Sequence, residues 1–161
     1  MELITATTIL WTMLSAANGA NEGFAYNTEM ANNQVTSQYV YKQTDCGKYL
    51  SQHLKYNFTY DAQHRLIQKE VLKWDPCNES WKKDFCLLYT YSQFGYTVKY
   101  APWNDATESY SQVTAKQTYD EIQNGAYRVA LYNWDQDKSR WDMQKNTLMM
   151  IPSKDLMAKL D

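Results

Sequence analysis

One motif occurs three times in the chain, and this recurrence constrains the fold more than any other feature. The motif W-[DN]-x5-[WY] pairs Trp74 with Trp81, Trp103 with Tyr110, and Trp134 with Trp141. A second marker lies between its copies, because Thr59-Tyr60-Asp61 returns as Thr90-Tyr91-Ser92 and as Thr118-Tyr119-Asp120. Self-similarity at about 30 residues indicates one supersecondary unit that is used three times and packs against its own copies.

Alternating polar and apolar side chains predict that the unit is a β-hairpin. The alternation runs from Gln34 to Ile151, and turn-forming residues divide it into about eight segments. Composition agrees, because 14 Tyr and 6 Trp against only 5 Gly and 3 Pro favour pleated, half-buried surfaces. We therefore predict an all-β, antiparallel up-and-down meander of about eight strands, built from three hairpin repeats of about 30 residues. Such a sheet must bend strongly or close partly into a barrel to protect its edges.

The ends of the chain differ from this pattern. Residues 3–17 form an apolar run that is too short to span a bilayer and is followed by small residues, which is typical of a secretory signal. We therefore expect a signal peptide over residues 1–19, a flexible leader over 20–33 and a single domain over 34–161. Met1-Glu2 lacks the basic residues of a signal. The alternative for the apolar run is a buried N-terminal helix. Ser153, after Pro152, predicts a short C-terminal helix.

Charge and cysteine content exclude several classes of partner. Lys and Arg number 16 against 18 Asp and Glu, without a run of like charges, so we expect no nucleic-acid partner and no anionic membrane partner. The apolar run over residues 3–17 is too short to span a bilayer, so we also expect no transmembrane anchor. The sequence has no CxxC motif, and its two His are not at ligand spacing, so we expect neither metal nor cofactor. Cys46 and Cys77 would lie at the same end of the meander, where a disulfide is one option and two free thiols the other.

The combined motifs resemble a known protein family. The turn T-Y-D-x-x-x-R-L, followed by K-W-D-x5-W and the strand L-Y-T-Y, resembles an uncharacterised family of small secreted proteins from gram-negative gut anaerobes. The resemblance covers residues 35–150 and implies export and an antiparallel β fold, but it supplies no catalytic residue. Tyr60-Asp61 with Arg65-Leu66 also resembles tyrosine-aspartate repeats, although these carry Gly where this chain has His64.

The paired rings are the candidate ligand-binding residues. If all W-[DN]-x5-[WY] loops lie at one end of the sheet, the six rings form a row that could stack on sugar rings. The alternative is that they fix strand register and belong to the core. The repeated acids Asp61, Asp75, Asp120 and Asp135 are expected to be turn formers rather than catalytic carboxylates. The ligand-binding candidates are Trp74, Trp81, Trp103, Tyr110, Trp134 and Trp141.

The resulting hypothesis is an exported, periplasmic or extracellular binding module that holds a glycan or an envelope protein. The alternatives are a polysaccharide hydrolase and a purely structural envelope protein. An enzyme is the less favoured class, because no nucleophile motif, phosphate loop or dinucleotide fingerprint occurs in the sequence.

Overall fold

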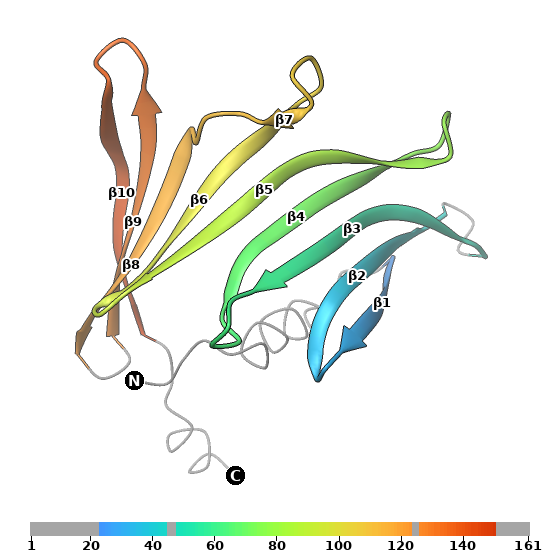
Figure 1. Cartoon of the computed structure of the whole chain (residues 1–161), viewed down its shortest axis with the longest axis horizontal. Helices are drawn as coiled ribbons and strands as arrows, with labels where there is room; N and C mark the ends of the chain where they lie inside the picture. The colour runs from blue at the N-terminus through green and yellow to red at the C-terminus, as the bar shows by residue number, and fades with distance from the viewer. Residues whose placement is uncertain (1–22, 45–47, 124–125, 151–161) are drawn as a thin grey trace.

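The computed structural model describes residues 23–44, 48–123 and 126–150, and these residues form one antiparallel β-sheet of ten strands (Figure 1). The strands are β1 (Phe24–Ala31), β2 (Gln34–Gln43), β3 (Leu50–Tyr60), β4 (Leu66–Asp75), β5 (Ser80–Ser92), β6 (Gly95–Asn104), β7 (Ser109–Tyr110), β8 (Ala115–Gln123), β9 (Ala126–Asp135) and β10 (Arg140–Met150). Each strand lies beside the next in the chain, except that β6 pairs with both β7 and β8. The predicted all-β, up-and-down topology is confirmed.

The sheet stays open, because its strand order begins at β1 and ends at β10 without a pairing between them. Of the two predicted ways to protect the edges, a strong bend or a partial barrel, the barrel is not formed by the residues that the structure describes. These residues contain no helix, so none of them forms a helix that could cross a membrane. The short helix predicted after Pro152, the signal peptide over 1–19 and Cys46 all lie outside the described residues.

Two differences raise the strand count from eight to ten, and the first corrects the leader. Phe24–Ala31 forms strand β1, although the sequence analysis expected residues 20–33 to be flexible. A tight turn joins β1 to β2, in which Asn32 and Asn33 both have positive φ, at 51° and 59°. Asn tolerates this left-handed conformation, and two such residues in succession make the turn that suits a twisted hairpin. The sequence signal for edge strand β1 is therefore its Asn32-Asn33 turn and not an alternation of apolar residues.

The second difference is that the strand predicted to follow Tyr110 is broken into β7 and β8. Its break lies opposite Pro102 of β6, whose carbonyl accepts a hydrogen bond from Ser111 N at 2.8 Å. The nitrogen of Pro102 lies on the same side as its carbonyl but carries no hydrogen to donate, so the ladder cannot continue regularly there. Residues 111–114 consequently interrupt the regular ladder, which resumes where β8 pairs with β6 at Ala115.

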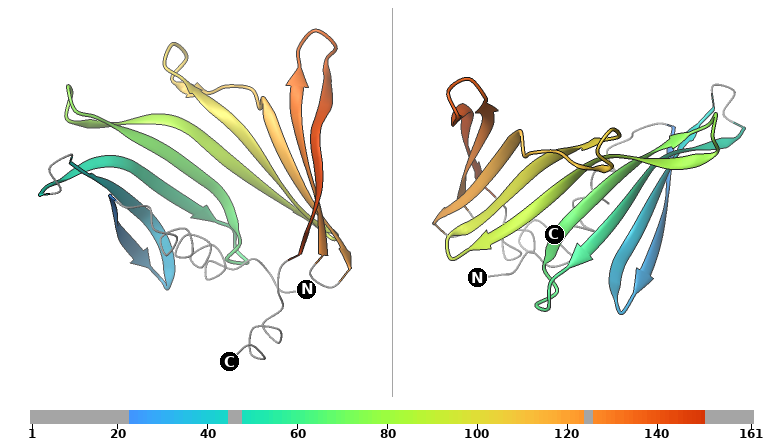
Figure 2. Two further views of the ribbon diagram at one scale, coloured as in Figure 1. Left: turned by 180° about the vertical axis from the view of Figure 1, so that it is seen from behind. Right: turned by 45° about the horizontal axis from the view of Figure 1, so that its top comes forward.

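The sheet is twisted and bent rather than flat. Six of the nine strand pairings contain a register shift. Each such bulge adds a residue to one strand and increases the local twist. Figure 2 shows the result from two further sides, with the β4–β5, β6–β7 and β9–β10 loops spread apart at one end of the sheet.

The opposite end of the sheet is held by a turn and a small core. Asp61 Oδ1 accepts hydrogen bonds from the backbone of Gln63 and Arg65, both at 2.9 Å, and His64 takes a left-handed φ of 62°. Asp61 is thus a turn former, as predicted. Beside this turn, buried Val35, Phe58 and Leu66 pack together under the rings of Tyr56, Tyr60 and Tyr89.

Strand register separates two chemically different faces. Glu70 pairs with Cys86 and Cys86 with Ala101, and these residues share a face with the rings at the hairpin ends. We call this the tryptophan face; it carries Trp74, Trp81, Trp103, Tyr110, Trp134 and Trp141. The opposite side, the tyrosine face, carries Tyr56, Phe58, Lys69, Val71, Phe85, Leu87, Tyr89, Tyr91, Tyr96, Tyr100 and Tyr119.

Candidate functional site

The three predicted ring pairs face each other across the hairpins. Trp74 pairs with Trp81, Trp103 with Tyr110, and Trp134 with Trp141 in the strand register. Their ring centroids are 5.2, 5.0 and 5.2 Å apart, and the rings meet edge to face at 65°, 75° and 65°. This geometry is the one that aromatic quadrupoles favour. The ring pairs therefore fix the register of the three hairpins.

The acid or amide of each motif shapes the loop that follows. Asp75 Oδ1 accepts from Cys77 N, Asn104 Oδ1 from Ala106 N, and Asp135 Oδ1 from Lys138 N, each at 2.9 Å. The last residue of each loop has a positive φ, at Glu79, Glu108 and Ser139. Asp75 and Asp135 are therefore turn formers, as predicted, whereas the prediction is wrong for Asp120, which lies within β8 opposite Gly95 and Arg128.

The six rings form three separate pairs rather than one continuous row. Among the described residues, ring contacts occur within each pair, but none joins one pair to another. All six rings are half-buried. Their spread follows from the splayed hairpin loops in Figure 1. A single long stacking platform across the strands, as the sequence suggested, is not present.

Lysines cover two of the pairs. Lys83 Nζ lies 4.6 Å from the centre of Trp103, and Lys116 Nζ lies 4.5 Å from the centre of Trp141. A cation over a ring face is attracted by the ring quadrupole and occupies the surface on which a sugar would stack. The Trp74–Trp81 pair instead contacts Tyr39, 6.1 Å from Trp81. It is thus the pair without a lysine among its described ring contacts.

Tyr110 is anchored by a hydrogen bond to a side chain on a distant strand. Its hydroxyl donates to Glu70 Oε1 at 2.9 Å, although β5 and β6 lie between the two residues. Cys86 and Ala101, which lie between them in register, are small and only 1% and 2% exposed. Burial and the hydrogen bond to Glu70 raise the pKa of Tyr110. This ring therefore covers the centre of the sheet and is unsuited to ligand stacking.

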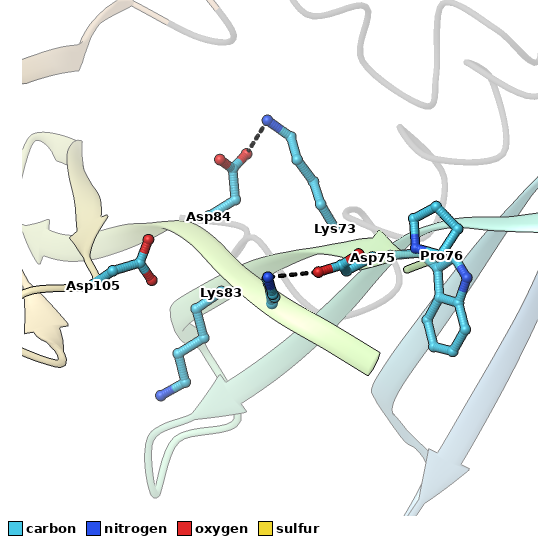
Figure 3. A pocket seen from close by; sticks show the side chains of 8 residues that line it. Lys73, Asp75, Pro76, Lys83, Asp84 and Asp105 are labelled. Atoms are coloured by element: carbon cyan, nitrogen blue, oxygen red, sulfur yellow. Dashed lines mark ion pairs between the residues drawn. The ribbon is translucent and has the colours of Figure 1, made fainter. Parts of the chain in front are cut away.

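A hollow opens beside Trp74 at the end of the β4–β5 hairpin (Figure 3). Its volume is about 320 Å³, near the lower end for small-molecule sites. Its walls combine one ring with side chains of both charges, namely Lys73, Trp74, Asp75, Pro76, Lys82, Lys83, Asp84 and Asp105. Among the candidate residues from the sequence analysis, Trp74 alone lines it.

A β-bulge supplies one wall of this hollow. The pairing shifts between Val71–Phe85 and Leu72–Lys83, which leaves Asp84 without a partner in the ladder. Its carboxylate then turns to Lys73, at 2.9 Å from Nζ. Figure 3 shows both side chains on one side of the hairpin, with Lys83 directed to the other. The hollow therefore wraps around the hairpin end rather than lying on one face.

Most charges around the hollow are already paired. Asp75 accepts from Lys82, and it also accepts from Asn78 Nδ2 at 2.6 Å. These hydrogen bonds, from Lys82 first and then Asn78, hold the pKa of Asp75 well below its usual range. The same pair raises the pKa of Lys82. Asp75 is therefore an ionised hydrogen-bond acceptor at neutral pH, and a general acid would need the opposite shift.

The two cysteines that the structure describes are both free thiols. Cys77 is an exposed free thiol, so no bridge to Cys46 is formed at this position, and Cys46 itself lies outside the described residues. Cys86 is also free, and burial followed by the nearby Glu70 raises the pKa of its thiol. In the described part of the chain, no three His, Cys, Asp or Glu side chains gather as metal ligands do.

Sequence reasoning missed the lysines and the bulge. The ring pairs fix the β9–β10 register, and Lys116 lies opposite Tyr132, two residues before Trp134. Cross-strand counting from the motif could therefore have found this lysine. The bulge at Asp84 has no such signal, because neither Gly nor Pro marks it.

The fold and the ring-paired hairpins define a class of single-sheet β-meander proteins. Within this class, the chain belongs to the DUF3836 family, a family of unknown function, whose profile matches residues 1–121. The predicted relationship to an uncharacterised family is thereby confirmed. No curated protein matches the chain.

Three crystal structures are similar to the chain. A protein of unknown function from Bacteroides fragilis is 19% identical, with a TM-score of 0.70 and coverage of 83% of this chain and 96% of that chain. A DUF3836 family protein from Bacteroides vulgatus is 30% identical, with a TM-score of 0.52 and coverage of 55% and 89%. One from Parabacteroides distasonis is 20% identical, with a TM-score of 0.42 and coverage of 86% and 97%. The first likeness concerns the fold alone.

Proposed function

We propose that this protein is an exported, non-catalytic glycan-binding module whose site is the hollow beside Trp74. Export is supported by the apolar run over residues 3–17 and the small residues after it. The observation that carries the binding proposal is the combination of the half-buried Trp74 ring with several hydrogen-bonding groups around an open hollow of about 320 Å³.

Sugars present two kinds of surface, and the hollow offers a match for each. The C–H face of a pyranose packs on a flat aromatic ring, for which Trp74 is available. Its hydroxyls both donate and accept hydrogen bonds, for which Asp75, Asp84 and the lysines beside them are available. Since these charges are already paired, they tolerate a neutral polyol that adds hydrogen bonds without breaking an ion pair.

The same electrostatics favour binding over hydrolysis. A glycosidase needs one carboxyl group with a raised pKa to protonate the leaving oxygen. The Lys82 ammonium and Asn78 shift the pKa of Asp75 in the opposite direction. Asp84 is paired with Lys73. These pairings support a site that holds a sugar and leaves its glycosidic bonds intact.

The test compares two tryptophans in equivalent pairs. Affinity electrophoresis against xylan, mannan, mixed-linkage glucan and pectin would be run on wild type, Trp74→Ala and Trp134→Ala. Trp134 is the matched control, because its pair has the same 5.2 Å separation and 65° angle but is covered by Lys116 and does not line the hollow. We expect Trp74→Ala to bind at least about tenfold more weakly than wild type, and Trp134→Ala to retain binding. A folded wild type that binds none of the four, or an equal loss in both variants, would contradict the proposal.

A further inference from the structure

The tyrosine face contains one lysine in an environment unlike that of the lysines at the hairpin ends. Lys69 lies in the middle of the sheet, opposite Phe58 on β3 and Leu87 on β5. Its ammonium nitrogen is 3.8 Å from the centre of the Tyr56 ring and 5.8 Å from that of Phe58. Two residues along the same face, Val71 is only 3% exposed. The charge is therefore placed among rings and aliphatic groups.

No carboxylate compensates this charge within the described part of the chain. Lys73, Lys82, Lys83 and Lys138 each form an ion pair with Asp or Glu, whereas Lys69 makes none. Ring faces attract the ammonium, but a cation–π contact supplies less than a hydrogen-bonded counter-ion does. Burial accordingly lowers the pKa of Lys69 to about 8. A cation held in this way gains more from an incoming anion than an exposed lysine would.

The groups around Lys69 are apolar or neutral. On β3 the face presents Tyr56 and Phe58, and on β5 it presents Phe85, Leu87 and Tyr89. Burial raises the pKa of Tyr56, and it raises the pKa of Tyr89 to about 12, so both phenols stay neutral near pH 8. The nearest charged side chain on the same face of β4 is Lys73, which is paired with Asp84. One positive charge thus stands on an apolar surface.

This surface has no second layer over it among the described residues, because they form a single sheet (Figure 1). On this surface Tyr56, Phe85, Leu87 and Tyr89 are half-buried, whereas Phe58 and Val71 are buried, at 7% and 3% exposed. Apolar surface left beside one uncompensated cation complements a ligand with an apolar body and one negative group. A polyanion would find no second unpaired cation beside Lys69 on β3, β4 or β5.

We propose that the tyrosine face over β3, β4 and β5 binds an amphipathic monocarboxylate, such as a fatty acid, with its carboxylate on Lys69 Nζ. The apolar chain lies along Leu87 and Phe85, where it removes apolar surface from water. The ion pair forms in a partly desolvated setting and orients the ligand. This site is on the opposite face from the rings of the hairpin pairs, and the proposed glycan site reaches the tyrosine face at the hairpin end, where Lys73 pairs with Asp84.

The test uses dodecanoate and dodecanol as probes in isothermal titration calorimetry with the full chain. Lys69→Met keeps the length and apolar character of the side chain and removes the charge. Lys73→Met is the matched control, because Lys73 lies on the same strand and face but is paired with Asp84. We expect wild type and Lys73→Met to bind dodecanoate with similar affinity, and Lys69→Met to bind it at least about tenfold more weakly. Dodecanol has the same alkyl chain as dodecanoate but no charge. We expect wild type to bind it about as weakly as Lys69→Met binds dodecanoate.

A second measurement does not depend on a variant. Reductive methylation of wild type, read residue by residue by mass spectrometry, should slow at Lys69 in the presence of dodecanoate and stay unchanged at Lys73. No dodecanoate binding by the folded wild type would overturn the proposal. Equal binding of dodecanoate and dodecanol would also overturn it, as would equal protection of Lys69 and Lys73.

Discussion

The uncompensated charge of Lys69 predicts that removing it stabilises the protein. Burial lowers the pKa of Lys69 from its usual 10.5 to about 8. Each unit corresponds to about 1.4 kcal/mol, so the charged form costs the folded state roughly 3 kcal/mol when both states are protonated. Lys69→Met should therefore raise the free energy of unfolding at neutral pH, which is unusual for a substitution inside a sheet.

The stability difference between Lys69→Met and wild type should depend on pH, because the lysine is charged only below its pKa. Above the unfolded pKa near 10.5 the lysine is neutral in both states, and the cost is absent. As the pH falls toward about 8, the unfolded chain takes up the proton first, and the folded state becomes relatively less stable. The advantage of Lys69→Met should thus shrink by roughly 2 kcal/mol between about pH 7 and about pH 9.5, where the tyrosines are still mostly protonated.

Urea unfolding followed by tryptophan fluorescence at several pH values measures this difference directly. Lys73→Met serves as the control, because its lysine is exposed and paired with Asp84. Packing changes caused by methionine alter the free energy of unfolding by the same amount at every pH. An advantage of Lys69→Met that is the same at both pH values would refute the view that Lys69 is an uncompensated, desolvated cation.

Three further predictions concern the sheet. A double-mutant cycle with Trp134→Ala and Trp141→Ala, measured by urea unfolding, should give a coupling of about 0.5–1.5 kcal/mol, and a coupling near zero would contradict the register role of these rings. Asp61→Asn should lower stability at neutral pH. Burial disfavours the charged Asp61, but the hydrogen bonds from Arg65 outweigh it and lower the pKa of this carboxyl. The gap to wild type should therefore close as the pH falls through that lowered pKa, and a gap independent of pH in thermal unfolding would count against it. Iodoacetamide should label exposed Cys77 in the native state and buried Cys86 only after unfolding, as mass spectrometry of labelled peptides would show, whereas similar rates at both thiols would contradict the burial of Cys86.

The sequence predicted the parts of the fold that depend on local pairing. A two-residue period and a fixed spacing between ring partners determine which residues face each other, and Trp74–Trp81 and Trp134–Trp141 pair as expected. The turn at Asp61 was also predictable, because its hydrogen bonds join residues that lie within five positions of one another in the sequence. Strand β1 was missed because its alternation is weak, although Asn32-Asn33 is a recognisable hairpin turn.

The parts that could not be predicted depend on bulges and on contacts between distant strands. A register shift such as the one at Asp84 changes which face a side chain takes, and it leaves no mark in the sequence. The splaying of the hairpin ends, which separates the ring pairs, follows from such shifts added along the sheet. Glu70 and Tyr110 lie 40 residues apart in the chain, and their hydrogen bond requires both the break after β7 and small residues between them.

In the proposed function, Trp74 beside the hollow binds sugar, while Trp134 in the equivalent ring pair does not. The most direct measurement is a ¹H–¹⁵N spectrum of the tryptophan indoles, titrated with oligosaccharides cut from the polysaccharide that retards wild type most strongly. The account predicts that the Trp74 signal shifts in a saturable way while those of Trp134 and Trp141 stay in place. Equal shifts at all indoles, or shifts at Trp134 and Trp141 without Trp74, would contradict it.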